Sequence, residues 1–175
     1  GSGVSYCATC DGGFFRGRTA AVVGGGNSAL EDALYLANLC KKVYIVYRRD
    51  SFRGFKSLAD QVFARENIEV LFHSEVTAVE GDFQVERITV VNARDGAART
   101  LAVDGLFIAI GMEPANDIFA GGLQLDERGF ISAGEDCKTS LPGVFAAGDI
   151  RTKPLRQIIT AAADGAVAAM AAFEY

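Results

Sequence analysis

Two short apolar runs, at residues 20–23 and 43–47, flank a stretch in which apolar residues recur every three or four positions. Continuous runs of this length are typical of buried strands, whereas the recurrence predicts an amphipathic helix. The apolar stripe of that helix consists of Leu30, Ala33, Leu34 and Ala37. A strand, a helix and a second strand in this order are typical of a dinucleotide-binding unit.

Three consecutive glycines separate the first strand from the helix. Gly24, Gly26 and Ala29 fit the G-x-G-x-x-G/A spacing of a pyrophosphate-binding loop, and Gly25 stands between the two glycines. Gly24 would allow the tight turn, and Gly26 would let the backbone approach a pyrophosphate. Ala29 is small enough for the helix to lie close to the strand. The spacing therefore predicts a nucleotide-binding bend.

Charged residues stand near both ends of the predicted helix. Glu31 and Asp32 are expected in its first turn, and Lys41 and Lys42 just past its last turn. Both placements suit the helix dipole, because its amino end favours negative charge and its carboxyl end favours positive charge.

Four cations within nine residues follow the second strand: Arg48, Arg49, Arg53 and Lys56. Units that bind NAD usually carry an acidic residue here, which holds the ribose hydroxyls. A cluster of cations suits a 2'-phosphate instead, so we expect NADP(H) as the cofactor. Two alternatives stay open, namely a solvated basic turn and a ribose contact from Asp50.

The remaining pattern predicts further elements on both sides of a break at residues 111–114. Before the break, we expect a helix at 58–66, a strand at 68–72, three antiparallel strands at 75–80, 83–92 and 99–103, and a buried strand at 106–110. After it, we expect a hairpin at 123–132, a short strand at 142–149 and an alanine-rich helix at about 155–173. The break predicts two domains, at residues 1–113 and 114–175.

Composition narrows the possible partners. The chain has 175 residues, a net charge of −5 and a sequence pI of about 4.9, which argues against a nucleic-acid partner. The sequence has no apolar run of 18 residues and no secretory signal, so we expect no membrane partner and a cytoplasmic location.

Cys7 and Cys10 are separated by two residues, and Asp11 follows at once. This gap lets a disulfide close and open with little movement of the backbone, and one thiolate of such a pair is readily stabilised. A neighbouring carboxyl can supply or remove the proton that thiol–disulfide exchange requires. The pattern therefore predicts a redox-active disulfide.

Half of a zinc site is the alternative for this pair. Zinc prefers four ligands, and the chain has no second CxxC and no paired histidine. Cys40, Cys137 and the single histidine, His73, are scattered along the sequence. We therefore expect no metal.

Six motifs in this order, CATCDG, GGGNSALEDALYLANL, YRRDSFR, GLFIAIG, GVFAAGDI and LRQIITAAADGA, closely resemble bacterial-type thioredoxin reductase. The resemblance covers nearly the whole chain. It implies an α/β fold, with a Rossmann-like three-layer NADPH-binding domain at residues 1–113 that has an antiparallel β-meander and carries the CxxC. Residues 114–175 would be the C-terminal segment of an FAD-binding domain, whose N-terminal half is expected to be missing.

The resemblance also implies roles for single residues. Cys10 would face the flavin, Cys7 would attack the disulfide of thioredoxin, and Asp11 would donate the proton. The implied cofactor-binding residues are Gly24, Gly25, Gly26, Asn27, Ser28, Arg48, Arg49 and Arg53 for NADPH, and Gly148, Asp149, Arg156, Gln157 and Ile158 for FAD. Ile110 and Gly111 are expected to contact a cofactor as well. The chain departs from the family at Tyr47, where a histidine is usual, which puts a histidine-specific contact in doubt.

The implied reaction passes electrons from NADPH through FAD to the dithiol and on to thioredoxin, in a full-length protein that is usually a homodimer. Two other functions stay open. The chain could be an NADP(H)-binding fragment without turnover, or a related flavoprotein reductase that serves a peroxidase or glutaredoxin-like partner. The arginine pair argues against the relatives that use NADH.

Overall fold

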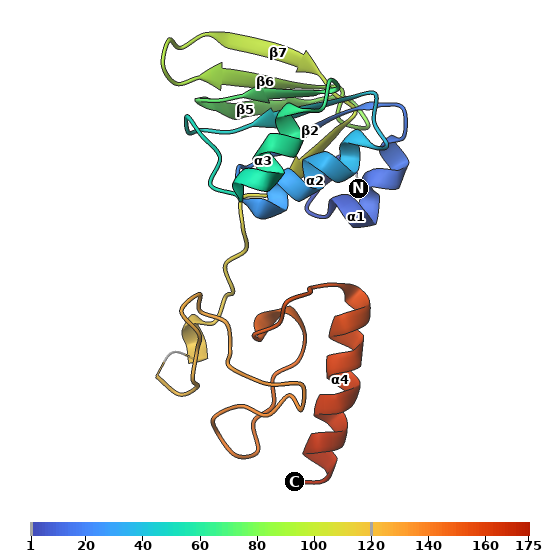
Figure 1. The fold of residues 1–175 in the computed structure, drawn as a ribbon. Helices are drawn as coiled ribbons and strands as arrows, with labels where there is room; N and C mark the ends of the chain where they lie inside the picture. Colours follow the sequence, from blue (N-terminus) through green and yellow to red (C-terminus); the bar gives the residue numbers. More distant parts are fainter. Residues whose placement is uncertain (1, 120) are drawn as a thin grey trace. The chain divides into compact units, whose positions relative to one another are not determined.

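The computed structural model describes residues 2–119 and 121–175. The chain forms two compact units, Gly1–Gly111 and Met112–Tyr175 (Figure 1). The division falls within the break that the sequence predicts at residues 111–114. The assignment of these units to a nucleotide and a flavin domain stays a prediction.

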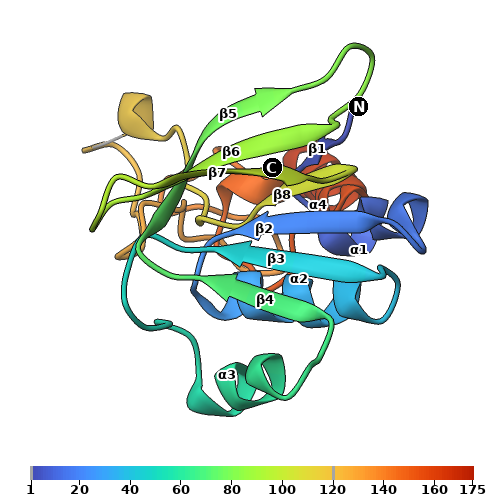
Figure 2. The same ribbon diagram turned by 90° about the horizontal axis from the view of Figure 1, so that it is seen from above.

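A five-stranded parallel sheet forms the centre of the first unit, in the order β1-β8-β2-β3-β4 (Figure 2). Its strands are β1 (Val4–Ser5), β2 (Thr19–Val23), β3 (Lys42–Val46), β4 (Ile68–Leu71) and β8 (Gly105–Ile108). The predicted apolar runs thus form the four longer strands. The pattern did not indicate β1, because two residues are too few to show a period.

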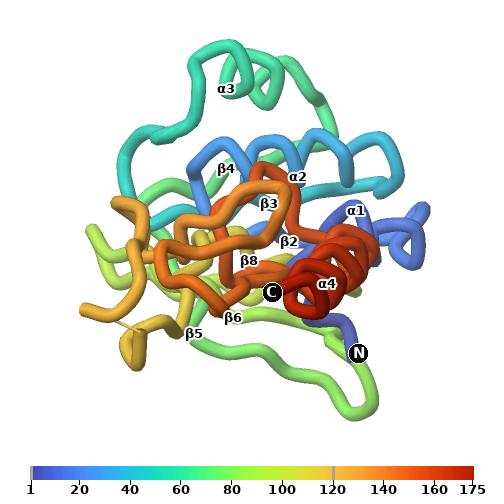
Figure 3. The backbone as a smooth tube through the Cα atoms, turned by 90° about the horizontal axis from the view of Figure 1, so that it is seen from below, coloured from blue at the N-terminus to red at the C-terminus, as the bar shows by residue number. Residues whose placement is uncertain are grey.

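Alternate residues of the central strands face two different layers, as the pleat of a strand requires. Ala20 and Val22 of β2 point to the face that is covered by α2 (Asn27–Ala37) and α3 (Lys56–Phe63), where Leu30 and Leu36 complete a core without solvent exposure. The two helices lie side by side on this face (Figures 2 and 3). The predicted helices are confirmed within a few residues at each end.

The opposite face of the sheet is covered by an antiparallel meander of three strands. These are β5 (Ser74–Glu80), β6 (Arg87–Asn92) and β7 (Ala98–Ala102), paired in that order. Ala21 and Val46 of the parallel sheet pack there with Ile88 and Leu101. The predicted three-layer α/β fold with an antiparallel meander is confirmed.

The predicted place of the acidic residues on α2 is wrong. Because the helix begins at Asn27, Glu31 and Asp32 fall in its second turn, and no acidic residue lies in the first turn. Burial, with a smaller effect from Glu31, raises the pKa of Asp32 to about 6. Asp32 therefore gains nothing from the amino end of the helix.

The second unit contains the long helix α4 (Ile158–Phe173) and two 3₁₀ turns, η2 (Asp117–Phe119) and η3 (Gly148–Ile150). The strand predicted at residues 142–149 is wrong, because only Phe145 pairs, in an isolated bridge with Lys138, and the run ends in η3. The predicted hairpin is limited to one antiparallel bridge, between Leu125 and Ile131.

A buried ion cluster joins α4 to η3. The Asp164 carboxylate accepts hydrogen bonds from Arg151 (2.7 and 2.8 Å), from Lys153 (2.7 Å) and from the Gly148 N–H (2.9 Å). Arg151, followed by Lys153 and the Gly148 N–H, lowers the pKa of Asp164 far below its usual value. Replacing one member would leave a buried charge unpaired, so the cluster fixes the second turn of α4 against η3.

No helix among the described residues is long and apolar enough to cross a membrane. Residues 2–119 and 121–175 also hold no group of three or more His, Cys, Asp or Glu side chains that could bind a metal ion.

Candidate functional site: a disulfide and a glycine bend

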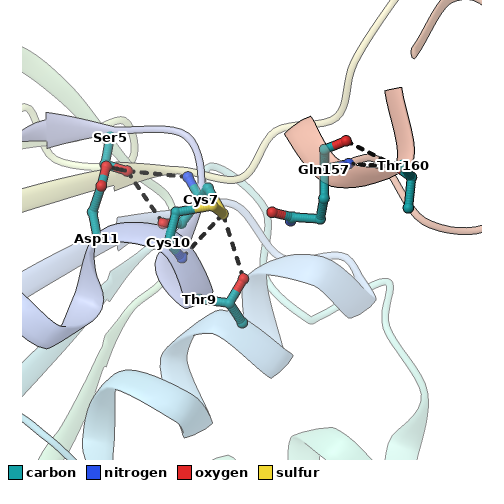
Figure 4. The surroundings of a disulfide bond; sticks show 7 residues. All are labelled: Ser5, Cys7, Thr9, Cys10, Asp11, Gln157 and Thr160. Carbon is teal, nitrogen blue, oxygen red and sulfur yellow. Dashed lines mark hydrogen bonds between the residues drawn. A yellow bond between two sulfur atoms is a disulfide. The ribbon is translucent and has the colours of Figure 1, made fainter. Parts of the chain in front are cut away.

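Cys7 and Cys10 form a disulfide at the start of the first unit, with their Cα atoms 5.3 Å apart (Figure 4). Cys7 is the N-cap of the short helix α1 (Ala8–Asp11), which follows β1 directly. Ala8 is fully buried and anchors this helix in the core, whereas Cys10 is exposed and Cys7 is half-buried. The disulfide thus stands next to a buried anchor, and of its two residues Cys10 is the more exposed.

Two polar groups lie close to the sulfur of Cys7. The Cys10 N–H donates to Cys7 Sγ at 3.2 Å, and Thr9 Oγ1 lies 3.4 Å from the same atom (Figure 4). A hydrogen bond to the charged form of a group favours that form. When the disulfide is opened, these contacts would stabilise a thiolate on Cys7.

Asp11 is held by Ser5, the last residue of β1. Ser5 Oγ donates to Asp11 Oδ2 at 2.7 Å, and the Cys7 N–H donates to Ser5 Oγ at 3.1 Å (Figure 4). Ser5 is only 5% exposed. One hydroxyl therefore links the backbone of a disulfide cysteine to the neighbouring carboxylate.

The three glycines of the bend differ in the space that a side chain would have at each position. Gly24 has a φ of 144°, and a Cβ there would stand 2.3 Å from the carbonyl oxygen of Ala109. A Cβ on Gly25 would stand 2.4 Å from the ring of Tyr47. A Cβ on Gly26 would meet no atom within 4 Å. Gly24 and Gly25 are thus required by packing, whereas Gly26 borders open space in which a ligand could lie.

The segment that carries Arg53 is fastened to this bend. The Arg53 N–H donates to the carbonyl of Gly25 at 2.7 Å, and the Phe55 N–H donates to Asn27 Oδ1 at 2.8 Å. Asn27, predicted as a cofactor contact, therefore uses its side-chain oxygen to hold the neighbouring loop. Ser28, in the first turn of α2, is exposed.

The three predicted arginines gather beside the bend. Arg48 and Arg49 follow Tyr47, whose ring lies against Gly25, and all three guanidinium-bearing side chains, including Arg53, are exposed. Over residues 2–119 and 121–175, none of them makes an ion pair. Asp50 accepts a hydrogen bond from Ser51 instead (3.0 Å). The three guanidinium groups thus have no direct ion-pair partner among the described residues, which leaves them available to a phosphate.

Strand order brings the two features to the same side of the unit. Since β1, β8 and β2 run parallel, the turn with Cys7, the segment with Ile110 and Gly111, and the bend at Gly24 all follow carboxyl ends at one sheet edge. Ile110 is 73% exposed, and Gly111 has a φ of 105°. In open α/β sheets, ligands bind at this edge.

The residues predicted to contact FAD lie in the second unit, around η3 and the start of α4. Asp149 is exposed, whereas Gly148 is buried and donates its N–H to Asp164. The Arg156 guanidinium lies 3.9 Å from the ring centroid of Phe130 and donates to two backbone carbonyls. Its contacts within the unit are therefore structural.

Gln157 and Ile158 lie next to each other at the beginning of α4. Gln157 is the N-cap, and its N–H donates to Thr160 Oγ1 at 3.1 Å in a capping box (Figure 4). Ile158, the first residue of the helix, is 90% exposed. The sequence pattern placed the beginning of this helix about three residues too early.

Comparison with known proteins defines the family. Residues 1–165 match the family described as pyridine nucleotide-disulphide oxidoreductase. The chain belongs to this family. Within it, the predicted resemblance to thioredoxin reductases is confirmed, because thioredoxin reductases from Peptoclostridium acidaminophilum and Listeria innocua are 43% and 44% identical over the full chain.

Solved structures of this oxidoreductase family have the same fold. The thioredoxin reductase of Streptococcus pyogenes is 42% identical and superimposes with a TM-score of 0.94 over 99% of the chain, and that of Giardia duodenalis is 38% identical with a TM-score of 0.87. In both cases the chain covers 57% of the other protein. It spans 58% and 55% of the two curated relatives.

Sequence reasoning missed two residues that contact the predicted site, Ser5 and Tyr47. Ser5 gave no signal because its partner, Asp11, is six positions away on another element. Tyr47 was noted only as a departure from the usual histidine, yet its ring explains why Gly25 must lack a side chain. A bulky residue that ends the second strand, combined with a middle glycine in the bend, was the signal available for this contact.

Proposed function

We propose that the chain is the nicotinamide-binding and dithiol-bearing portion of an NADPH-dependent flavoprotein disulfide reductase. It would pass electrons from NADPH, through FAD, to the Cys7–Cys10 disulfide and on to a thioredoxin-like protein. The observation that carries the proposal is a cluster of uncompensated arginines beside an open glycine bend, in the same unit as a disulfide.

NADP(H) fits the residues at the bend. Its pyrophosphate would lie on Gly26, where the structure leaves room, and near the first turn of α2 with Ser28. The 2'-phosphate would lie among Arg48, Arg49 and Arg53, which form no ion pair with any carboxylate of the described residues. Each charge-assisted hydrogen bond to a phosphate contributes about 1.5–3 kcal/mol, so the cluster would favour NADPH over NADH by tens- to hundreds-fold.

FAD fits one position of the second unit. The Asp149 side chain is exposed and makes no hydrogen bond to any described residue, so it can accept one from a ribityl hydroxyl. When bound, a flavin supplies a two-electron relay between a nicotinamide and a disulfide. The ion cluster at Asp164 would keep η3 and the start of α4 in a fixed arrangement beside it.

The chain's own residues support the exchange chemistry. In the dithiol form, the Cys7 thiolate would attack a substrate disulfide, forming a mixed disulfide and releasing one substrate thiol. Cys10 would then attack Cys7 Sγ, which closes the intramolecular disulfide and releases the second thiol. The contacts from the Cys10 N–H and Thr9 to Cys7 Sγ favour this assignment of the attacking sulfur, and Asp11 would carry the proton.

Isothermal titration of the chain with NADPH and with NADH tests the nucleotide proposal. We expect Arg48→Ala combined with Arg49→Ala to weaken NADPH binding about a hundredfold and NADH binding by less than threefold, because only NADPH presents the 2'-phosphate. Arg16→Ala combined with Arg18→Ala is the matched control. It removes the same charge from exposed residues next to the opposite end of β2.

Equal affinity of the wild-type chain for the two nucleotides would contradict the proposal. A loss in the control pair as large as in the Arg48 and Arg49 pair would show that only net charge matters. The flavin part is tested separately by the absorbance of the chain after incubation with FAD and gel filtration. If NADPH binds and no flavin is retained, the chain acts alone as a nucleotide-binding module.

A further inference from the structure

We propose that Ser5 is a positioning residue for thiol–disulfide exchange, because it holds the Asp11 carboxylate in place beside the redox turn. The inference rests on the proposed dithiol function and adds a residue to it. It concerns a hydroxyl on the sheet, outside the CxxC motif, that reaches both the cysteine backbone and the acid.

The hydrogen bonds assign the hydroxyl proton to the acid. Ser5 Oγ lies 2.7 Å from Asp11 Oδ2 and 3.3 Å from the Cys7 carbonyl oxygen. A hydroxyl has only one proton to donate, and the nearer, charged acceptor makes the stronger bond. The Cys7 N–H meanwhile donates to the lone pair of the same oxygen at 3.1 Å. The Ser5 hydroxyl thus donates to the Asp11 carboxylate and accepts from the Cys7 N–H.

The sheet fixes this hydroxyl. Ser5 pairs with Phe107 in the parallel ladder between β1 and β8, and Phe107 is fully buried. Asp11, in contrast, is only half-buried, at the point where α1 passes into the 3₁₀ turn η1 (Gly12–Phe15). Of the two side chains Ser5 is the more deeply buried, so its hydroxyl is the fixed partner that determines where the carboxylate points.

Exchange at this disulfide requires a proton to move. When a dithiol such as dithiothreitol reduces the Cys7–Cys10 bond, its thiolate attacks one sulfur and the other leaves as a thiolate. A second attack within the mixed disulfide oxidises the reagent to its cyclic disulfide, and its two thiol protons end on Cys7 and Cys10. Asp11 can take up and return these protons only if it stays next to the turn, which is what the Ser5 hydroxyl provides.

The rate at which dithiothreitol reduces the disulfide of the purified chain tests the inference. Acid quenching, alkylation and mass spectrometry count the thiols at each time. We expect Ser5→Ala to slow reduction about tenfold, which is the lower end for loss of one hydrogen bond to a charged group. Ser74→Ala is the matched control, because Ser74 is 6% exposed and its hydroxyl donates to the Phe72 carbonyl, far from the cysteines in sequence.

Two further variants separate positioning from mere packing. Ser5→Thr keeps the hydroxyl and Ser5→Val has the same shape without it, so we expect Thr to stay within threefold of wild type and Val to be slowed like Ala. This pair also serves if Ser5→Ala does not fold. In an Asp11→Asn background, which is slow already, Ser5→Ala should cause no further loss, because the hydroxyl acts through the carboxylate.

Three results would overturn the inference alone: an unchanged rate in Ser5→Ala, equal rates in Ser5→Thr and Ser5→Val, or the same tenfold loss in the Asp11→Asn background. A wild-type pair that dithiothreitol cannot reduce would overturn the dithiol function as well. The two failures are therefore distinguishable, since the second is visible before any variant is made.

Discussion

Gly26→Ala separates ligand binding from folding more sharply than any other change at the bend. Gly26 has a φ of −90° and a ψ of −178°, which any residue can adopt, and the added methyl would meet no atom within 4 Å. Alanine is a poorer N-cap than glycine by roughly 0.5–1 kcal/mol. It also lowers the entropy of the unfolded chain, which stabilises the fold by about 0.4–1 kcal/mol. The two effects nearly cancel, so stability should change by less than about 0.5 kcal/mol.

Nucleotide binding should respond very differently. The methyl would project into the open space beside the bend, where the proposed pyrophosphate lies against the backbone. We expect NADPH affinity to fall at least tenfold, which corresponds to about 1.4 kcal/mol. Gly25→Ala gives the opposite pattern, because its Cβ would stand 2.4 Å from the Tyr47 ring. Overpacking of this kind costs about 1–3 kcal/mol of stability.

The assay pairs fluorescence titration with NADPH and thermal unfolding of the same samples. Gly13→Ala is the control, because its added Cβ also meets no atom within 4 Å but lies outside the bend. An unchanged NADPH affinity in Gly26→Ala, with the fold intact, would refute the placement of the pyrophosphate. A large loss of stability would refute the statement that Gly26 borders open space.

Two predictions concern one buried and one half-buried acid, and both are checked by chemical denaturation at several pH values. Asp164→Asn should destabilise the second unit by about 3–5 kcal/mol at pH 7, because Arg151 and Lys153 lose their partner. Since folding lowers the pKa of Asp164, its contribution is present above about pH 4 and is lost as the pH falls further, so wild type and variant should converge in acid. Asp32 is the reverse case, because its pKa is raised to about 6 and wild-type stability falls as pH rises from about 4 to 6. Asp32→Asn should therefore stabilise the first unit by about 1 kcal/mol at pH 7, allowing for solvent screening, and have little effect at pH 4. A pKa near 4 for the Asp32 carboxyl, measured by NMR, would contradict the prediction for Asp32→Asn.

The sequence predicted those parts of the fold in which a period can be counted. The four apolar residues at 20–23 and the stripe on α2 are both buried when the helix packs on the strand. The run at 142–149 contains four consecutive apolar residues, at 144–147, which suggested a buried strand. Apolar residues indicate burial, but they do not show that a neighbouring strand is available for backbone hydrogen bonds. Ala146 is indeed buried, yet the only β-pairing that the described residues of this segment form is the isolated bridge between Phe145 and Lys138.

The residues of the candidate site also fall into a group that the sequence predicted and a group that it did not. The cysteine pair and the glycines were predictable, because the members of each set are close together along the chain and have a recognisable spacing. The contact between Ser5 and Asp11 joins two different elements, and so does the contact between Tyr47 and Gly25. No spacing along the chain indicates either contact. Asp32 shows the same limit for electrostatics, since the start of the helix at Asn27 decides the turn to which the acid belongs.

The strand order also predicts how the two parts of the site should behave toward each other. β8 lies between β1 and β2, so the disulfide turn and the glycine bend are two strand spacings apart at one edge, which is about 10 Å. Hydride transfer needs reacting atoms about 3–3.5 Å apart, so a separate carrier suits this arrangement. Changes at sites about 10 Å apart that share no partner usually act independently. Gly26→Ala should therefore leave reduction of the disulfide unchanged, and Ser5→Ala should leave NADPH affinity unchanged, whereas cross-effects in both would mean that the bend and the redox turn form one continuous site.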